Sequence, residues 1–557
     1  MRWSTQRPLA RCQAMRDAGA VSSLQAAEGR ATTAPLMATH QTVRNGAKGA
    51  VLAVAFGAAL VAALGGGLTG CATGPTYAPP KVEMPASWAT EAPWGVGQPA
   101  DGASKGPWWQ RFDDPVLAEL EQKALVGSPT LALAAARLAQ SRALLAGTSA
   151  AVLPQVGLGE RVTRQRISAN RPLTNYNSTN FSTIQNDFSV AMSVNYEVDL
   201  AGRVSSSIEG AKASAEQIAA DAENTRLLLT TDLAGAYFNL RAVDFDLDVV
   251  TRATALQRRS LELVTNRREL GAASGLEVAQ QQALLDSTLV QVDLLRRQRG
   301  IYEHAIATLT GTPAPIFGLA ANLRTTAVPA IPLGVPSDVL QRRPDVASAE
   351  RAMAAANAQI GLARAAYYPS IVLGGNLGVD SRSLTSLLDA PSLLWSLGVS
   401  SAQVLFDGGR ITSSVDFARA GYDATVATYR RTVLQAMQEV QDGITGLAAL
   451  ERASAQADIA VASASKVLAL ATARYEGGVA TYLEVITAQQ GLLAAERQAT
   501  QLRGQRLLTA VFLVKALGGD WPATPGRSGM SEPARPSVLA AFAMTLSRLA
   551  MRRYWGT

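Results

Sequence analysis

The chain has 557 residues, 48% of them hydrophobic, so it is long enough for several domains. Its formal net charge of +7 comes from its two ends: residues 1–70 and 522–557 are strongly basic, whereas residues 71–521 carry a net charge near −2. The body therefore offers no basic surface for phosphates, which excludes a nucleic-acid-binding protein. Two cysteines and two histidines exclude a disulfide framework and a histidine-based metal or catalytic cluster.

A secretory signal is predicted before residue 71. Residues 49–80 contain no charged residue, Arg44 and Lys48 stand just before them, and an apolar run leads into Leu-Thr-Gly and Cys71. A positive region, a short apolar region and small residues before the cut are typical of such signals. The ending resembles a bacterial lipoprotein signal, in which Cys71 becomes the lipidated first residue. The alternative is a transmembrane anchor, because the uncharged run is long enough to span a bilayer.

Residues 1–70 are therefore expected to be a leader with a lipoprotein signal peptide. Its first 36 residues fit no signal peptide, so we expect the true start at Met37. The seven prolines of residues 72–107 predict that residues 71–115 form an extended, lipid-anchored arm rather than a domain. Asp114-Pro115 is a typical helix entry, so a helix is expected from about Val116.

The next part, residues 116–318, predicts a helix, a strand pair and a long helical hairpin. An Ala-rich helix is expected over 128–151. From Phe188 to Val198 apolar and polar residues alternate strictly, over the length that a tilted strand needs to cross a bilayer. A soluble β-sandwich also alternates, so this pattern alone leaves both alternatives open.

A stretch without helix breakers follows the strands. Residues 203–267 contain no proline, and a helix of this length would measure about 100 Å. A coiled coil or a helical tube uses such a helix, whereas a globular domain does not. The glycine-containing segment 269–275 predicts a tight turn, from which a helix of about 30 residues returns.

Residues 319–521 repeat this order of elements. Adding 207 to the number of Arg203 gives Arg410, and adding 207 to Gly271 gives Gly478, within segments that match residue by residue. A period of about 210 residues indicates a duplicated domain rather than a solenoid. The repeat raises the number of expected strands to four. Four strands cannot close a barrel alone, so several chains must share one.

Ordered motifs carry a family resemblance. Gln341-Arg342-Arg343-Pro344-Asp345-Val346 is followed by Ile360-Gly361, and both hairpin turns contain Arg-x-Glu-x-Gly. These residues resemble the outer membrane factors, the TolC-type export ducts of Gram-negative bacteria, and most closely the NodT-type efflux lipoproteins. The resemblance covers roughly residues 71–521. Residues 522–557 have no counterpart, and we expect a poorly ordered C-terminal extension.

The resemblance implies an α+β membrane duct. Three identical chains would each give four strands to a twelve-stranded outer-membrane β-barrel, continuous with a long periplasmic α-helical barrel. This homotrimer would be a lipid-anchored protein of the cell outer membrane that extends into the periplasm. It would be the passive channel of a tripartite efflux system, with a periplasmic adaptor and an inner-membrane pump as partners.

No enzyme, cofactor or metal is implied. The sequence has no phosphate-binding Gly-rich loop with lysine, no nucleophile elbow and no metal-ligand spacing. The main alternative is a structural coiled-coil envelope lipoprotein, which would not need bilayer-length strands.

A periplasmic gate is implied near the second hairpin. Glu484 matches an acidic family position near the channel axis, and Thr487 stands where a second acid often occurs. Glu277 is the counterpart of Glu484 on the first hairpin. Threefold symmetry would place three Glu484 carboxylates in a ring that repels anions and attracts cations. The alternative is a solvated glutamate that pairs with a neighbouring helix.

Docking positions for the adaptor are implied at both hairpin turns. The matching residues are Gly271, Ser274, Gly275, Leu276, Gly478, Thr481 and Leu483. The alternative role of the glycines is only to make the turn. Both roles can hold together, because small residues also let helix tips approach closely.

Overall fold

The computed structural model describes residues 74–78, 107–168, 183–329 and 343–519. The predicted leader, Cys71 and the predicted C-terminal extension lie outside the described residues, as does the arm from 79 to 106. The structure therefore bears on the two predicted repeats and on a short piece of the arm.

The described body begins with a 3₁₀ turn, η1 (Trp108–Phe112), and helices α2 (Pro115–Gly127) and α3 (Pro129–Ser149). The side chain of Asp114 caps α2, where Oδ1 accepts hydrogen bonds from the backbone N–H of Val116 at 3.0 Å and of Leu117 at 3.2 Å. Pro115 fits the first helical position because its missing N–H needs no partner there. The predicted helix entry is confirmed.

Four antiparallel strands form one sheet in the order β1-β2-β3-β4. They are β1 (Gln155–Ile167), which follows a short turn η2 (Ala150–Val152), β2 (Thr183–Val198), β3 (Ser370–Ser381) and β4 (Leu393–Ala402). The turns η4 (Leu384–Ser386) and η5 (Ala390–Ser392) lie between β3 and β4. Each half of the chain gives one hairpin, and the β2–β3 pairing joins the halves. The strands β1 and β4 are left as edges.

The two faces of the sheet differ in chemistry. One cross-strand row is wholly apolar and consists of Leu158, Met192, Leu377 and Trp395. The next row lies on the opposite face, because successive side chains of a strand alternate, and it consists of Gly157, Ser193, Asn376 and Ser396. The predicted alternation therefore gives the sheet one apolar and one polar face.

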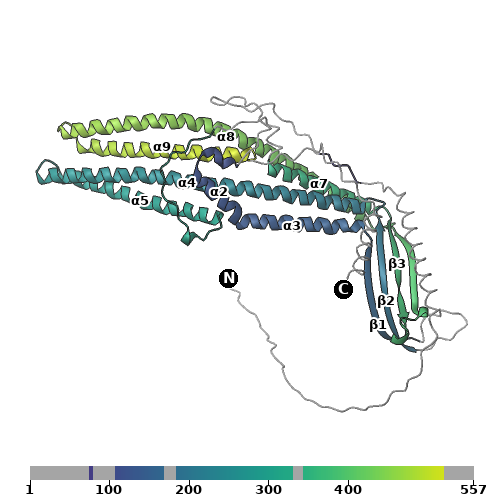
Figure 1. Cartoon of the computed structure of the whole chain (residues 1–557). Coiled ribbons are helices and arrows are strands. Elements are labelled where there is room, and N and C mark those ends of the chain that lie inside the picture. Colours follow the sequence, from purple (N-terminus) through teal and green to yellow (C-terminus); the bar gives the residue numbers. More distant parts are fainter. Residues whose placement is uncertain (1–73, 79–106, 169–182, 330–342, 520–557) are drawn as a thin grey trace, which may run out of the picture. The chain divides into compact units, whose positions relative to one another are not determined.

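Long helices make up most of the described chain (Figure 1). They are α4 (Arg203–Glu269) and α5 (Gly275–Leu309), followed by the turn η3 (Ala314–Ile316), and then α7 (Pro344–Ala365), α8 (Arg410–Glu476) and α9 (Tyr482–Ala516). Both α4 and α8 have 67 residues, and both α5 and α9 have 35. This equality confirms the internal duplication.

Each strand-to-helix switch contains a glycine with a positive φ. Gly202 caps α4 at φ 73° and Gly409 caps α8 at φ 91°, in the left-handed region that favours glycine. Asp199 and Asp407 then accept hydrogen bonds from the first backbone N–H groups of these helices. Repeated turn chemistry therefore starts the long helices at equivalent positions.

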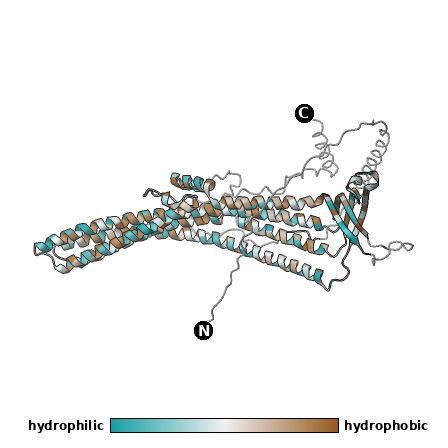
Figure 2. Cartoon of the chain, turned by 90° about the horizontal axis from the view of Figure 1, so that it is seen from below, coloured by the Kyte–Doolittle hydropathy of each residue, from teal (hydrophilic) through white to brown (hydrophobic). Residues whose placement is uncertain are grey.

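The largest core lies where the helix bundle meets η1 and α2. Trp108, Trp109 and Phe112 are buried there against α4, and the ring of Phe112 is 5.0 Å from that of Phe238. Along the long helices, apolar and hydrophilic residues are interspersed (Figure 2). Within the described residues, every helix is too short or too polar to serve as a membrane span.

Arg343 joins three helices beside this core. Its guanidinium pairs with Asp345 at 2.7 Å and with Glu439 of α8 at 2.8 Å, and donates to the carbonyl oxygen of Ala516 at 2.9 Å. The side chain is almost fully buried, so these contacts compensate the cost of removing its charge from water. Arg343 is thus a structural residue that holds the start of α7 against the middle of α8 and the end of α9.

Candidate functional site

The tip of the first helical hairpin is built by two backbone motifs. Gly271 has φ 75°, and the N–H of Ala272 donates to the carbonyl oxygen of Arg267 at 2.7 Å, which closes the C-terminus of α4. Ser274 then caps α5, since its Oγ accepts a hydrogen bond of 3.3 Å from the N–H of Glu277. Glycine is needed at 271 for the left-handed backbone, and serine at 274 for the cap.

The second hairpin repeats this turn with one difference. Gly478 has φ 74°, and the N–H of Val479 donates to the carbonyl oxygen of Arg474 at 3.0 Å. Thr481 stands at the cap position of α9, but its side chain makes no capping hydrogen bond. The two tips are therefore similar in backbone and differ in side-chain bonding.

A pair of tyrosines joins the second hairpin to the first. The phenolic oxygen of Tyr475, on α8, donates a 2.8 Å hydrogen bond to Oε2 of Glu277 on α5. Tyr482, on α9, donates a 2.9 Å bond to Oε1 of the buried Gln281. The two rings are 4.9 Å apart, and the guanidinium of Arg267 lies 4.7 Å from the centre of the Tyr475 ring.

The environment of this pair keeps both phenols protonated. Burial raises the pKa of Tyr482 to about 12. Burial and the hydrogen bond to Glu277 raise the pKa of Tyr475. The phenols therefore remain hydrogen-bond donors at physiological pH. Sequence reasoning missed both tyrosines, although their place beside the two glycine turns was visible.

The predicted gate residues lie in different surroundings. Glu484 is about half exposed, and its carboxylate lies 3.6 Å from Nε of Arg474 on the neighbouring helix of the same hairpin. Thr487 is exposed and donates to the carbonyl oxygen of Leu483. Glu277 is partly buried and bound to Tyr475. Of the three, Glu484 and Thr487 are therefore the exposed residues.

The predicted docking residues lie at the tips and are exposed. Apolar side chains stand among them: Leu276 is 67% exposed and Leu483 is 57% exposed. Leu270 and Val479, which the sequence analysis did not single out, are 83% and 70% exposed. Each hairpin tip therefore exposes two large apolar side chains.

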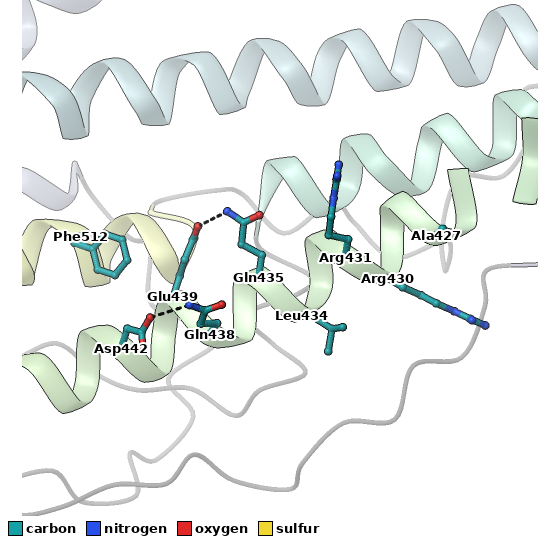
Figure 3. Close-up of a pocket in the computed structure, with 9 residues that line it drawn as sticks. All are labelled: Ala427, Arg430, Arg431, Leu434, Gln435, Gln438, Glu439, Asp442 and Phe512. Atoms are coloured by element: carbon teal, nitrogen blue, oxygen red, sulfur yellow. Dashed lines mark hydrogen bonds between the residues drawn. The ribbon is translucent and has the colours of Figure 1, made fainter. Parts of the chain in front are cut away.

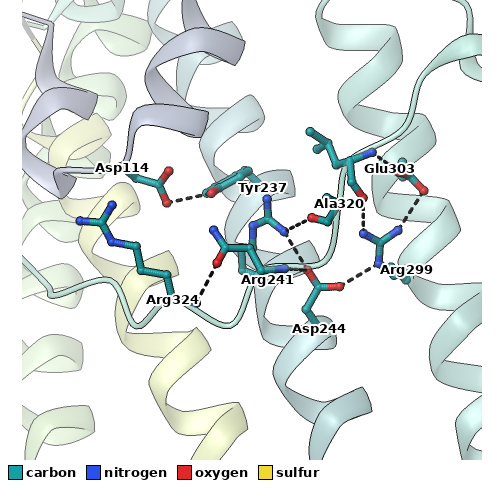
Figure 4. Close-up of polar contacts among 10 residues, drawn as sticks. Asp114, Tyr237, Arg241, Asp244, Arg299, Glu303, Ala320 and Arg324 are labelled. Atoms are coloured by element: carbon teal, nitrogen blue, oxygen red, sulfur yellow. Dashed lines mark hydrogen bonds and ion pairs between the residues drawn. The ribbon is translucent and has the colours of Figure 1, made fainter.

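A buried ionic network fixes the connection that follows the first hairpin (Figure 4). Asp244 on α4 pairs with Arg241 at 2.8 Å and with Arg299 of α5 at 2.7 Å. Arg241 also donates to the carbonyl oxygen of Ala320 at 2.8 Å. Nearby, Tyr237 donates to Asp114 at 2.7 Å. The network ties α2, α4, α5 and the segment near residue 320 together.

A hollow of about 850 Å³ lies along α8 (Figure 3). Its nine lining residues include Arg430, Arg431, Glu439 and Asp442 on α8 and Phe512 on α9. The acids are bonded to glutamines one helical turn away or to Arg343. Within the described part of the chain, no three His, Cys, Asp or Glu residues gather as a metal site would require. Both acids of the hollow are thus already engaged by neighbouring side chains.

A known protein family matches this chain in two segments, one in each repeat. Residues 120–312 and 335–519 match the model of the family described as outer membrane efflux protein. This chain belongs to that family. The match falls on the two structural repeats in turn, so each repeat carries the features of the family.

Named relatives cover most of the chain. The toluene efflux pump outer membrane protein TtgF of Pseudomonas putida is 33% identical over 469 residues, which are 82% of this chain and 96% of the relative. The pyoverdine export outer membrane protein OpmQ of Pseudomonas aeruginosa is 30% identical over 74% of this chain and 87% of its own. The open state of the Neisseria gonorrhoeae MtrE outer membrane channel is 26% identical with a TM-score of 0.70, over 81% of this chain and 99% of that one.

Proposed function

We propose that the chain is the outer-membrane duct of a tripartite efflux system and that it moves substrates passively from the periplasm to the exterior. One observation carries the proposal: a sheet with one apolar and one polar face continues directly into helices of 67 residues. The alternative, a structural coiled-coil envelope lipoprotein, would need the helices but not such a sheet. A lipid-facing apolar side and a water-facing polar side are what a transmembrane barrel requires.

The duct is a homotrimer in this proposal. In one chain β1 and β4 each have an unpaired edge, and open edges cannot persist within a bilayer. Three chains that pair β1 of one with β4 of the next close a twelve-stranded barrel. The polar row with Asn376 and Ser396 then lines the lumen, and the row with Leu158 and Trp395 meets lipid.

The helices would cross the periplasm and present their tips to an adaptor, which in turn joins an inner-membrane pump. The exposed Leu270, Leu276, Val479 and Leu483 support this docking role, together with the predicted positions Gly271, Ser274, Gly275, Gly478 and Thr481. A coiled-coil hairpin of an adaptor would bury these apolar side chains.

A gate at the same end is the second part of the proposal. Glu484 would form a ring of three carboxylates. Thr487 stands where a second acid often occurs, so the gate would have one ring of charge rather than two. The 3.6 Å ion pair with Arg474 moderates the charge of that ring. Glu277 acts in a different way, because it holds Tyr475 and thereby the second hairpin.

Lipid anchoring at Cys71 is supported by the short described piece of the arm. Asn357 of α7 donates a 2.8 Å hydrogen bond to the carbonyl oxygen of Pro75, and Tyr77 donates to the carbonyl oxygen of Glu350 at 3.2 Å. Gly74 lies against Gly361, close to the end of α7 that leads into β3. Three residues span at most about 11 Å, so a lipid on Cys71 would reach the membrane beside the sheet.

The cargo is proposed to be set by the pump. Relatives of similar identity are named for toluene and for pyoverdine, which are chemically unlike each other. A wide polar lumen discriminates little between such compounds. We therefore expect small molecules as cargo, with the class chosen at the inner membrane.

Two measurements test the proposal together. The full chain, produced in a Gram-negative strain that lacks its own efflux ducts, should fractionate with the outer membrane and restore efflux when a matching adaptor and pump are co-produced. The purified protein should be a trimer by native mass spectrometry and should conduct ions in planar bilayers. A monomer that conducts no ions would favour the alternative, a structural coiled-coil envelope lipoprotein.

A further inference from the structure

The apolar face of the sheet ends in two arginines. The last apolar row pairs Val162 with Phe188. One row beyond it Arg164 lies opposite Asn186, and two rows beyond it Arg166 lies opposite Ile184. β1 pairs with β2 without a break in register, so both arginines stand on the face that carries Leu158.

These arginines lie at the end of the sheet that is remote from the helices. β1 begins just after α3 and runs away from it, and β2 returns to Val198, just before α4. In the proposed duct this end opens to the exterior. Arg164 and Arg166 therefore lie where the hydrocarbon layer gives way to the headgroups of the outer leaflet.

The arginine of β1 that precedes these two lies on the opposite face, three residues before Arg164. Arg161 points to the polar face, where its guanidinium is paired with Asp187 at 2.9 Å. On the apolar face the one acid of β1 is Glu160, about 13 Å along the strand from Arg164. Arg164 is thus separated along β1 from the acid that shares its face, and the side chains of both Arg164 and Arg166 are exposed.

We infer that Arg164 and Arg166 form a site for the phosphate groups of an outer-leaflet lipid. Their Cα atoms are about 7 Å apart, so both guanidinium groups can engage one phosphorylated headgroup. Arginine binds phosphate in a planar, two-pronged geometry and keeps its charge at a membrane surface. The acyl chains of the same lipid would lie along Val162 and Leu158.

The test uses the purified full-length trimer and diphosphoryl lipid A as the probe. Arg164→Gln with Arg166→Gln should weaken binding by about tenfold in a native mass spectrometry titration. Arg161→Gln is the matched control, since it removes an arginine from the other face of the same strand, and binding should then stay as in the unmodified protein. Lipid A without its phosphates should bind the unmodified trimer as weakly as diphosphoryl lipid A binds the double variant.

The inference would be overturned if the double variant bound diphosphoryl lipid A as tightly as the unmodified protein does. It would also be overturned if Arg161→Gln lost as much binding as the double variant, or if lipid A without phosphates bound the unmodified trimer as tightly as diphosphoryl lipid A. The inference rests on the proposed duct, and its failure can be told apart from failure of the duct. Variant trimers that conduct ions but bind the lipid unchanged overturn only the lipid site. Absence of trimers or of conductance in the unmodified protein overturns the duct.

Discussion

Tyr475 and Glu277, 198 residues apart in the sequence, are joined by a 2.8 Å hydrogen bond that links the second hairpin to the first. The Arg267 guanidinium lies over the same ring, so three helices meet at this tyrosine. A contact between the hairpins limits how far the second can move alone. It is therefore the place to test whether the hairpin end of the proposed duct is held closed.

Tyr475→Phe should loosen that end. The change removes one hydrogen bond, a loss of about 1 kcal/mol, and leaves Oε2 of the partly buried Glu277 without the hydroxyl that donates to it. Conductance of single trimers in planar bilayers should rise. Tyr368→Phe removes a hydroxyl from a half-exposed tyrosine far from the tips and should leave conductance unchanged. Equal conductance in both variants would contradict a latch at Tyr475.

Glu484→Gln should reduce the preference of the channel for cations. Three carboxylates leave the proposed ring, so the reversal potential in a KCl gradient should move toward that of a non-selective pore. Glu476→Gln is the control, because Glu476 is exposed at the end of α8 on the same hairpin. A shift of the same size in the control would assign the selectivity to net charge rather than to the gate.

Gly478→Trp should abolish export and leave trimers in the outer membrane. A Cβ at this glycine meets no atom within 4 Å, so a large side chain has room and would project from the tip. The φ of 74° makes any side chain strained by about 1–2 kcal/mol. Gly478→Ala carries that strain without the bulk and should keep most export in drug-accumulation assays. Full export by Gly478→Trp would contradict docking at this tip.

Asp244→Asn should destabilise the protein by about 3 kcal/mol or more, because it leaves the charges of Arg241 and Arg299 without their shared counter-ion in a buried site. Asp248→Asn changes an exposed pair with Arg252 one helical turn away and should cost about 0.5 kcal/mol or less. The midpoints of heat-induced unfolding in detergent compare the two. Similar unfolding midpoints for the two variants would show that the network of Asp244, Arg241 and Arg299 does not stabilise the fold.

The stability of the protein should fall as pH rises because of Glu121. This carboxyl on α2 is fully buried without a hydrogen-bond partner, and burial raises its pKa to about 9. The folded state therefore holds a proton that the unfolded state releases near pH 4.5, so stability is lost progressively from there up to about pH 9.

Glu121→Gln removes this dependence. The variant should gain stability over the unmodified protein as pH rises, by up to about 3 kcal/mol at pH 7. Heat-induced unfolding at pH 5 and at pH 8.5 gives the comparison. A difference between variant and parent that stays constant over this range would mean that Glu121 is not protonated in the folded state.

The elements of the fold could be read from the sequence, because each depends on local chemistry. The absence of proline from 203–267 predicted α4 to within two residues of its end, and strict alternation located β2. The duplication then supplied the same elements for the second half. Helix-breaking residues and the alternation of apolar and polar residues act over a few neighbouring positions. Helices and strands can therefore be recognised in a single sequence.

The contacts between the elements could not be predicted in this way. Arg241 and Asp244 are one helical turn apart, but Arg299 reaches them only through the register of α4 against α5. The second repeat does not indicate this network either, because Ala448 stands at the position equivalent to Arg241. The link between Tyr475 and Glu277 likewise depends on how two separate hairpins pack.

The equal lengths of the two hairpins have a consequence for stoichiometry. Two turns of one backbone design, each reached by 67 residues of helix, give every protomer a pair of near-equivalent tips. In a trimer the pair becomes a pseudo-sixfold set of tips. An adaptor that recognises one such tip would therefore assemble as six copies around three. A threefold arrangement would require it to distinguish Ser274, which caps its helix, from Thr481, which does not.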